Sequence, residues 1–325
     1  MEMAQRSIFE RPMERFTPVR TLRDAIYGKV VLCKQDQCDG DNFVAIKMMC
    51  LANVTTKTAV RTGHRVKEDG GEEMAILMSL PPHPSIVNLL EYFEHDGMLC
   101  LVLEYCAFGE LFDHLARHNQ RQPHLHPSQP QRMSQPSPNK TPPAYMSERQ
   151  AATWFRQIVD GVRHIHANGI AHRDLSLENV LLDANQHCRI CDFGLSSREG
   201  KSCLGRVGKT FYMAPEVYFG DHQRYNGFKA DIWSLGILLF ILLSGIPPLE
   251  VPSEIDARFR IIRQEGVQEL AKMWGLAISN EALDLLSFIL RARPEERPSL
   301  DEILSHPWFE TRWVDGVTGN RVVVA

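Results

Sequence analysis

The pattern of apolar residues changes from strand-like to helix-like along the chain, and this change limits the fold more than any other feature. Residues 29–32 and 43–48 are rich in β-branched side chains and flank residues 39–42, Asp-Gly-Asp-Asn, a turn signal between two predicted strands. Residues 99–103 form another apolar run of strand length. From about Gly109 onward, apolar residues recur at spacings of three and four, which predicts helices.

Two lobes follow from this change of pattern. We expect an α+β fold with a small, strand-rich lobe over about residues 17–103, a hinge at 104–107 and a larger helical lobe over 108–313. Residues 1–16 are then an N-terminal extension and residues 314–325 a C-terminal tail. Because ligands favour clefts between domains, we expect the functional site near the hinge.

Two helices of the larger lobe can be located from their apolar residues. One begins at Ser147, which forms a capping-box pattern with Gln150. Its apolar positions share one face: Ala151, Trp154, Phe155, Ile158, Val159, Val162 and Ile165. The other, residues 232–243, is apolar on all sides and should be buried. Its most apolar run, residues 237–243, is too short to span a bilayer.

Residues 117–146 interrupt the helical lobe. They are rich in Pro, Gln, Ser and His with almost no apolar periodicity, so we expect a disordered insertion between two helices. Two interpretations are open. The stretch is either a lineage-specific loop or a proline-rich docking segment, with residues 135–138 and 141–143 as its candidate motifs.

Charge and cysteine content exclude several classes of protein. A formal net charge of −4 gives no electrostatic support for a nucleic-acid partner. Eight cysteines spread over 325 residues indicate reduced thiols rather than a disulfide framework. Residues 1–20 mix charged and apolar side chains and lack the apolar run of a signal peptide. We therefore expect a cytoplasmic or nuclear protein without a membrane partner.

Four short motifs occur in a fixed order. Val44-Ala45-Ile46-Lys47 is followed by His172-Arg173-Asp174 with Asn179 five positions after the aspartate, then by Asp192-Phe193-Gly194 and Ala214-Pro215-Glu216. Each motif alone is a weak signal. The ordered set resembles the eukaryotic protein kinase family over about residues 17–313. The resemblance implies a bilobal protein kinase fold, in which one helix accompanies the antiparallel sheet of the small lobe.

The resemblance also implies a role for the polar residues of these motifs. Phosphoryl transfer needs charge neutralisation on a triphosphate, metal ions and an oriented hydroxyl. Lys47 would hold the α- and β-phosphates of ATP. Asp174 would orient the substrate hydroxyl and accept its proton. Asn179 and Asp192 would bind Mg²⁺, a hard ion that prefers carboxylate and amide oxygens.

Further nucleotide-binding positions follow from the same resemblance. The expected partner of Lys47 is Glu73, with Glu72 as the alternative if the helix is rotated by one residue. The hinge at Glu104 and Cys106 would pair with adenine through its backbone. The other expected nucleotide-binding residues are Ala25, Gly28, Val30, Ala45, Leu103, Glu110, Leu181 and Cys191.

Other matching positions have structural roles in the family. The stacked regulatory spine is expected to consist of Leu77, Leu90, His172, Phe193 and Asp231. Arg297 matches the arginine that pairs with the glutamate of the Ala-Pro-Glu motif, here Glu216. Residues 306–309, His-Pro-Trp-Phe, are similar to the calmodulin-dependent-kinase-like group.

The loop that covers the phosphates departs from the family pattern. With Gly28 as its third glycine, Arg23 and Ala25 stand where the first two glycines are usual. Glycines let backbone N–H groups approach phosphate without a Cβ in the way. Arg23 therefore indicates a stiffer or differently shaped lid, which is either a tolerated variant or a loss of ATP binding.

The catalytic loop departs more sharply. Serine/threonine kinases normally place lysine two residues after the catalytic aspartate, and here that position is Ser176. The residue seven before Glu216 is usually threonine, and here it is Lys209. We hypothesise that lysine and hydroxyl have exchanged places, which would put the Lys209 ammonium beside Asp174. In the alternative, Lys209 points to solvent and Thr210 takes the role of the threonine.

Regulation and substrate preference are readable in outline. Arg173 precedes the catalytic aspartate, an arrangement that pairs with a phosphorylated activation loop, and Ser202 is the best-placed acceptor for an upstream kinase. Gly70-Gly71 weakens the first turn of the small-lobe helix, so we expect that helix to be mobile.

Glu110 and Glu178 are either the acids that bind basic residues before the target hydroxyl or a ribose contact and a solvated charge.

The sequence thus predicts a serine/threonine protein kinase that uses ATP and Mg²⁺ and acts on protein substrates. A pseudokinase or weakly active nucleotide-binding scaffold is the alternative, favoured by Arg23, Ala25 and Ser176. A zinc site at Cys188 and Cys191 is disfavoured because no second pair completes it, so packed thiols are expected there.

Overall fold

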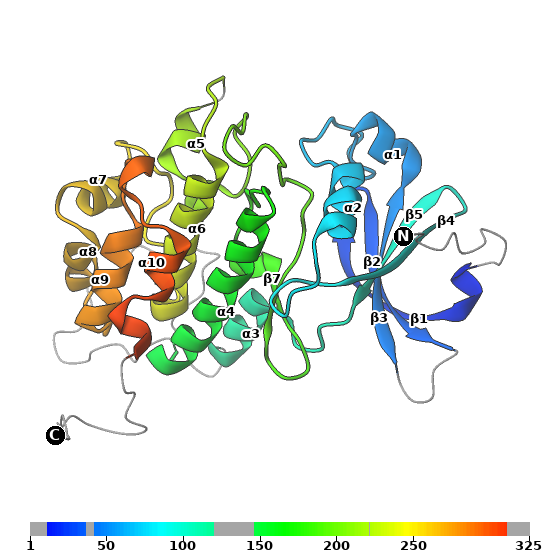
Figure 1. Cartoon of the computed structure of the whole chain (residues 1–325), viewed down its shortest axis with the longest axis horizontal. Coiled ribbons are helices and arrows are strands. Elements are labelled where there is room, and N and C mark those ends of the chain that lie inside the picture. The colour runs from blue at the N-terminus through cyan, green and yellow to red at the C-terminus, as the bar shows by residue number, and fades with distance from the viewer. Residues whose placement is uncertain (1–11, 37–41, 120–145, 221, 311–325) are drawn as a thin grey trace.

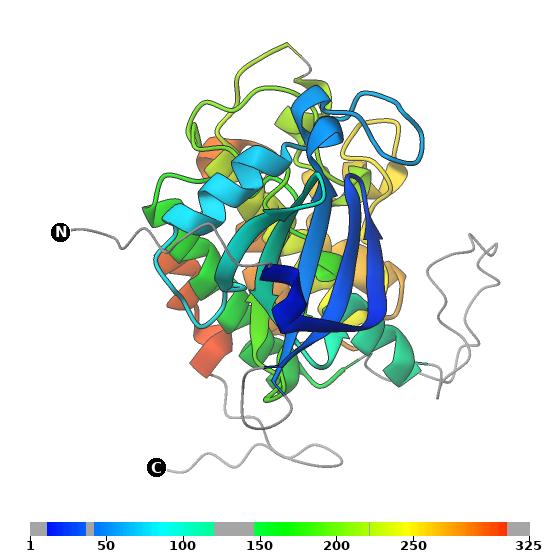
Figure 2. The same cartoon turned by 90° about the vertical axis from the view of Figure 1, so that its right-hand side faces the viewer.

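A five-stranded antiparallel sheet forms the small lobe in the computed structural model, which describes residues 12–36, 42–119, 146–220 and 222–310 (Figures 1 and 2). The strand order is β1-β2-β3-β5-β4. The strands are β1 (Phe16–Ala25), β2 (Gly28–Gln35), β3 (Phe43–Cys50), β4 (Leu89–His95) and β5 (Met98–Glu104). The strands expected at 29–32, 43–48 and 99–103 lie within β2, β3 and β5. The predicted turn between the first two falls mostly on residues outside the described part.

The two faces of this sheet have different environments because side chains alternate along a strand. Val44 and Ile46 of β3 are buried in an apolar cluster on one face. Ala45 and Lys47 point to the other face, toward the large lobe, where they line a cleft. The alternation of β3 therefore places the lysine in the cleft.

The described part of the small lobe contains the expected helix and a second, short α-helix. The expected helix is α2 (Gly70–Ser79), whose N-terminus is capped by the Asp69 side chain accepting from the Glu72 N–H. The additional helix, α1 (Leu51–Thr56), directly follows β3. Its last residues, Val54-Thr55-Thr56, are β-branched and poor helix formers, which is why the sequence did not indicate it.

Residues 51–69, here called the β3–α2 connector, contact three other parts of the protein. The Val60 N–H donates to the Ile26 carbonyl in the β1–β2 turn at 2.9 Å. Lys67 Nζ donates to the Arg206 carbonyl at 2.5 Å. The connector ends at Asp69, whose N–H donates to the Gly194 carbonyl at 2.8 Å and whose side chain caps α2.

The large lobe is mainly helical (Figure 1). A small sheet of β6 (Gly109–Glu110), β7 (Val180–Leu182) and β8 (Cys188–Ile190) lies beside the hinge. Its helices are α3 (Leu111–Asn119), α4 (Glu148–Ala167), α5 (Pro215–Phe219), α6 (Gly227–Ser244), α7 (Ala257–Gln264), α8 (Val267–Met273), α9 (Asn280–Ile289) and α10 (Leu300–Leu304).

Helices α4 and α6 form the core of the large lobe, as predicted. All seven apolar residues expected on one face of α4 are buried, and Ser147 is its N-cap. Helix α6 is long and apolar enough to cross a membrane by length and composition, but 83% of that stretch is buried inside the protein. Its apolar composition is accounted for by this burial.

Two expectations about positions need correction. Leu90 is 55% exposed and cannot belong to a buried spine; its neighbour Leu89 packs against the core instead. The strand pairing is irregular between Leu89 and Glu91, and such a bulge reverses which side chains face inward. The predicted insertion begins too early, because residues 117–119 still belong to α3; residues 120–145 lie outside the described part.

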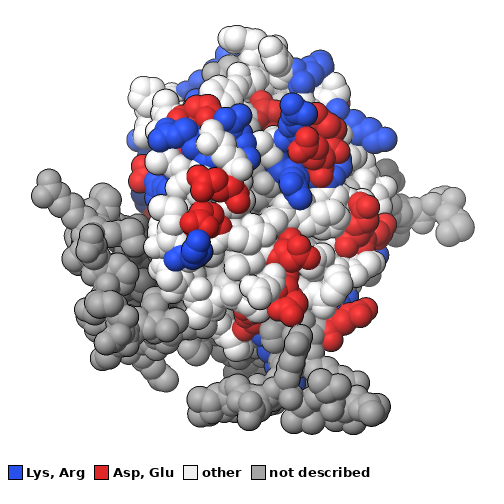
Figure 3. All heavy atoms as spheres, turned by 90° about the vertical axis from the view of Figure 1, so that its left-hand side faces the viewer, with Lys and Arg blue, Asp and Glu red and all other residues white. Residues whose placement is uncertain are grey.

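Figure 3 shows one face of the large lobe, on which lysine and arginine lie mainly in the upper half, among acidic residues. The lower half of the described surface carries mostly aspartate and glutamate. A basic stripe is the usual electrostatic footprint of a nucleic-acid-binding protein. This face therefore offers no support for such a partner.

Candidate active site

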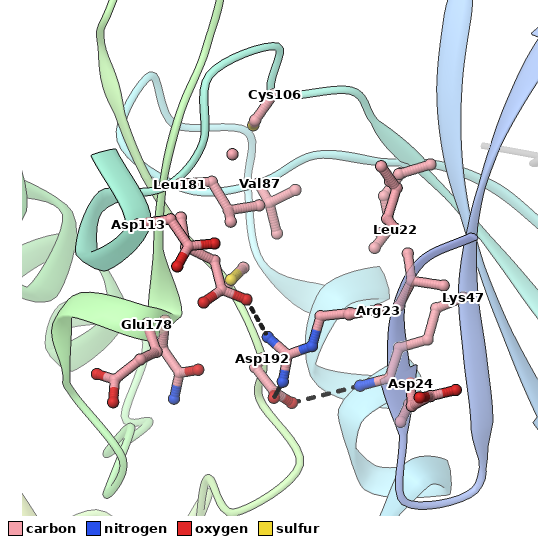
Figure 4. A pocket seen from close by; sticks show the side chains of 18 of the residues that line it. Leu22, Arg23, Asp24, Lys47, Val87, Cys106, Asp113, Glu178, Leu181 and Asp192 are labelled. Atoms are coloured by element: carbon pink, nitrogen blue, oxygen red, sulfur yellow. Dashed lines mark hydrogen bonds and ion pairs between the residues drawn. The ribbon is translucent and has the colours of Figure 1, made fainter. Parts of the chain in front are cut away.

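A cleft of about 990 Å³ lies between the two lobes, with the hinge at its back. This volume is in the range of sites for small ligands. All five expected catalytic residues line it: Lys47, Asp174, Asn179, Asp192 and Lys209. Figure 4 shows Lys47 entering from the sheet of the small lobe toward Asp192, which comes from the large lobe.

Lys47 is held between two carboxylates. Its Nζ donates to both oxygens of Glu73 at 2.7 Å and to Asp192 Oδ1 at 3.3 Å. Burial alone would lower the pKa of Lys47, but the charges of Asp192 and Glu73 outweigh it and raise that pKa. The alternative partner, Glu72, lies on the outer side of α2 and pairs with Arg198 at 2.9 Å.

Asp192 is ionised and held in an unusual backbone conformation. The charge of Lys47 lowers its pKa to about 2, against the opposing effect of burial. Its φ is +67°, a value that non-glycine residues rarely adopt and that clusters at functional sites. An ionised carboxylate is therefore fixed in the lining of the cleft.

The catalytic loop is fixed by buried hydrogen bonds. Asn179 Nδ2 donates to the Asp174 backbone carbonyl and to its Oδ2, both at 2.7 Å. Asp231, at the start of α6, accepts from the N–H groups of His172 and Arg173 at 2.8 Å. Arg173 has a φ of +67°. The Asp231 carboxylate thus holds a strained turn that presents Asp174 to the cleft.

Lys209 lies in the activation segment, residues 192–216, and reaches the catalytic loop, residues 172–179. Its Nζ donates to Ser176 Oγ at 2.7 Å and lies 3.6 Å from Asp174 Oδ2. The side chain therefore contacts the catalytic loop rather than pointing to solvent. Gly208 precedes it with a φ of +89°, and a Cβ there would come within 2.8 Å of the Arg173 carbonyl. Glycine at this position allows the segment to lie directly against the loop.

The hinge end of the cleft is apolar. Val30 and Ala45 line it from the small lobe, and Leu181 lines it from the large lobe. The expected residues Leu103, Glu104 and Cys106 of the hinge line the cleft, as do Ala25, Glu73, Glu110 and Cys191. A flat apolar slot beside backbone donors and acceptors is suited to a planar heterocycle.

Gly28 is the exception among the expected nucleotide-binding residues, because it does not line the cleft. It pairs with Met49 across the β2–β3 ladder, and a Cβ there would lie 2.1 Å from the Met48 carbonyl oxygen. Glycine at this position therefore allows two strands to approach closely rather than leaving room for a ligand.

Sequence reasoning missed several charged residues inside the cleft, among them Arg23 and Glu68. Arg23 Nη1 donates to Glu110 Oε1 at 3.0 Å, and its Nη2 lies 4.0 Å from Asp192 Oδ2. Glu68 also lines the cleft, and burial followed by the charge of Asp192 raises its pKa to about 7. Arg23 had been read only as a stiffening residue of the lid. No sequence pattern placed Glu68 in the cleft, because a glutamate in a connecting segment is normally solvated.

The remaining expectations concern residues around the site. Cys188 and Cys191 are buried free thiols, and burial raises both pKa values well above normal. Among the described residues, no group of three or more His, Cys, Asp or Glu side chains is arranged to hold a metal ion. Arg297 pairs with Glu216 through two 2.7 Å hydrogen bonds, as the family pattern implies.

Comparison with known proteins gives a consistent result. The family model of the protein kinase domain matches residues 20–309. NUAK family SNF1-like kinase 2 of Homo sapiens is 31% identical over 296 residues, covering 90% of this chain and 40% of the relative. Calcium-dependent protein kinase 33 of Arabidopsis thaliana is 33% identical over 312 residues, covering 93% and 52%. CBL-interacting serine/threonine-protein kinase 24 of the same plant is 32% identical over 307 residues, covering 94% and 59%.

These relatives are longer than the chain, which spans between 40% and 59% of their lengths. Two of them are named as a calcium-dependent and a serine/threonine protein kinase, in agreement with the predicted resemblance. The α+β fold of two lobes, with a sheet-based small lobe and a helical large lobe, is confirmed as well. The chain belongs to the protein kinase family.

Proposed function

We propose that the protein is a serine/threonine protein kinase that transfers the γ-phosphate of ATP to serine and threonine hydroxyls of protein substrates. One observation carries this proposal. A single cleft brings together the Lys47–Glu73 ion pair, the ionised Asp192 and the hydrogen-bonded Asp174 and Asn179. This is the set of groups that phosphoryl transfer requires.

The cleft suits ATP at both ends. The apolar slot beside the hinge would hold adenine, and the Lys47 ammonium would hold the phosphates. Glu110, on β6, would bind the ribose. Asp192 supplies an ionised carboxylate, and the Asn179 amide nitrogen is turned toward Asp174, so the amide oxygen is the atom available to a metal. These oxygens fit Mg²⁺, which would neutralise charge on the phosphates when bound.

Asp174 would act as the base. Its Oδ2 accepts from Asn179 Nδ2 at 2.7 Å, which holds the carboxylate in one orientation at the cleft. A substrate hydroxyl that donates to the same carboxylate would be both positioned and relieved of its proton. The strained turn held by Asp231 makes that orientation independent of the substrate.

Lys209 would replace the missing catalytic-loop lysine. Its ammonium contacts Ser176 Oγ and lies near Asp174, so a positive charge stands beside the base although it comes from the activation segment. The serine hydroxyl accepts from the ammonium and fixes its position. In this proposal, lysine and hydroxyl have exchanged places across the interface between the two segments.

The Lys209→Ala variant should lower kcat by about tenfold to a hundredfold, the effect of losing one charge-assisted hydrogen bond. Lys201→Ala is the matched control, because Lys201 is exposed on the same segment. Lys209→Thr combined with Ser176→Lys should be more active than Lys209→Thr alone, since it restores the arrangement of the family. A Lys209→Ala variant within twofold of the parent would disprove the exchange.

The activity itself is tested with radiolabelled ATP and a generic basic protein. Label should appear on serine and threonine of the substrate in the parent, and not in Asp174→Asn. ATP binding without transfer would instead support a pseudokinase scaffold, the alternative that Arg23, Ala25 and Ser176 favour. A substrate with basic residues before the target hydroxyl should be preferred, because Glu178 lines the cleft.

The activation segment is proposed as the regulatory element. Arg224 Nη1 contacts the backbone carbonyl and hydroxyl of Ser202 at 2.7 and 3.3 Å, so a phosphate on Ser202 would have an arginine beside it. Arg173 donates to the Leu204 carbonyl at 2.7 Å. An upstream kinase that modifies Ser202 would therefore stabilise this segment.

We propose a cytoplasmic or nuclear location, consistent with the free thiols of the described cysteines.

A further inference from the structure

Arg23 is a cationic residue of the cleft that the proposed mechanism leaves without a role. It stands on β1, at the first glycine position of the phosphate-covering lid. Its side chain crosses the cleft and connects the small lobe to two acids of the large lobe, Glu110 at 3.0 Å and Asp192 at 4.0 Å. Figure 4 shows the Arg23 guanidinium and the Lys47 ammonium both directed at the Asp192 carboxylate.

Two cations therefore share one carboxylate. Lys47 lies 3.3 Å from Asp192 Oδ1, and Arg23 lies 4.0 Å from Oδ2. Lys47 is also held by both oxygens of Glu73, and its side chain is only 11% exposed. The Arg23 side chain is 44% exposed. Of the two, Arg23 has the weaker contact and the greater freedom to move toward a ligand.

The net negative charge of the cleft would favour a movement of Arg23 toward a bound triphosphate. Acidic residues outnumber basic ones among its lining residues, nine to five, so a triphosphate would meet an excess of negative charge. A glycine-rich lid would offset this with closely approaching N–H groups, and this lid lacks two of those glycines. A guanidinium supplies up to five donors in a planar fork and binds phosphate in a bidentate manner.

The acids that hold Arg23 are also the ones that the nucleotide would occupy. In the proposed function, on which this inference rests, Asp192 binds Mg²⁺ and Glu110 binds the ribose. When MgATP binds, Asp192 would exchange its contact with Arg23 for Mg²⁺, and Glu110 would exchange its contact for the ribose. The guanidinium is then left beside the triphosphate. We propose that Arg23 is a triphosphate-binding residue: it holds Asp192 and Glu110 in the nucleotide-free cleft and moves onto the phosphates when MgATP binds.

The test compares the affinities of ATP with Mg²⁺, ADP with Mg²⁺ and adenosine by equilibrium competition against a fluorescent adenine-site dye. Arg23→Met keeps the length of the side chain and removes its charge. It should lower the ratio of ATP affinity to adenosine affinity about tenfold or more, the range for a lost hydrogen bond between charged groups. Arg23→Lys should retain part of the ratio. Arg61→Met is the matched control, since Arg61 pairs with Asp24 of the same lid and does not line the cleft.

The ratio of ATP affinity to adenosine affinity distinguishes an Arg23 that binds phosphate from one that only holds the two lobes together. If Arg23 only closed the empty cleft, Arg23→Met would tighten ATP and adenosine equally and leave the ratio within twofold of the parent, which would overturn this inference alone. A parent that binds ATP no more tightly than adenosine would overturn the proposed function together with it. Thermal unfolding should give the same midpoint for all variants, because Arg23 is partly exposed.

Discussion

The Asp174→Asn variant is expected to lose between a hundredfold and ten-thousandfold in kcat, the range for removing a general base. Asparagine has the same shape as aspartate, so the backbone turn held by Asp231 should persist. The amide no longer accepts the proton of the substrate hydroxyl, and it no longer pairs with the Lys209 ammonium, 3.6 Å away. Initial rates with radiolabelled ATP and protein substrate measure the loss.

The affinity for ATP distinguishes lost chemistry from a damaged site. Asp174→Asn should bind ATP with a dissociation constant within about threefold of the parent, because Lys47 and Asp192 are unchanged. Asp301→Asn is the matched control, since Asp301 is an exposed aspartate that pairs with Arg163 on the surface and should leave kcat unaltered. Asp174→Asn activity above a tenth of the parent would contradict the role of Asp174 as the base.

The Arg297→Ala variant should lower the free energy of unfolding by about 3–5 kcal/mol, the cost of removing one partner of a buried ion pair. The Arg297 side chain is 0% exposed. It donates to both oxygens of Glu216 at 2.7 Å and to the carbonyls of Lys229, Arg291 and Ala292. Alanine would leave the Glu216 carboxylate without this partner and the large lobe with a cavity. Urea unfolding followed by tryptophan fluorescence measures the change.

An exposed ion pair serves as the comparison. Arg163→Ala removes contacts to Asp160 and Asp301 from a side chain that is 49% exposed, and should cost less than about 1 kcal/mol. Arg297→Lys should lie between the two variants, because lysine keeps the charge but loses the bidentate geometry. A loss below 1 kcal/mol for Arg297→Ala would show that the pair does not hold the activation segment to the large lobe.

The parts of the fold that sequence reasoning predicted correctly depend on local patterns. The β-branched runs of β2 and β3, the apolar face of α4 and the wholly apolar α6 each follow from neighbouring residues. The motif residues could be placed in one cleft because their order and spacing match a family. Lys209 was tied to Ser176 on the same basis, since two departures from one pattern suggested a compensating pair.

The failures have physical reasons of a different kind. Leu90 was misplaced because the irregular pairing between Leu89 and Glu91 is set by the partner strand. Gly28 was assigned to the ligand, whereas the approach of the Met48 carbonyl requires it. Arg23 and Glu68 acquire their surroundings only when the lobes meet. Contacts between distant segments, rather than local propensity, decide each of these cases.

The β3–α2 connector has a thermodynamic consequence for regulation. It touches the lid at Ile26, the activation segment at Arg206 and Gly194, and α2 through the Asp69 cap. If these contacts form and break together, ordering of the activation segment and closure of the lid are linked equilibria. Such linkage is reciprocal. If a modification that orders the activation segment raises the affinity for nucleotide by some factor, then bound nucleotide raises the equilibrium constant for ordering the segment by the same factor. Nucleotide concentration and modification of the segment would then shift the same conformational equilibrium.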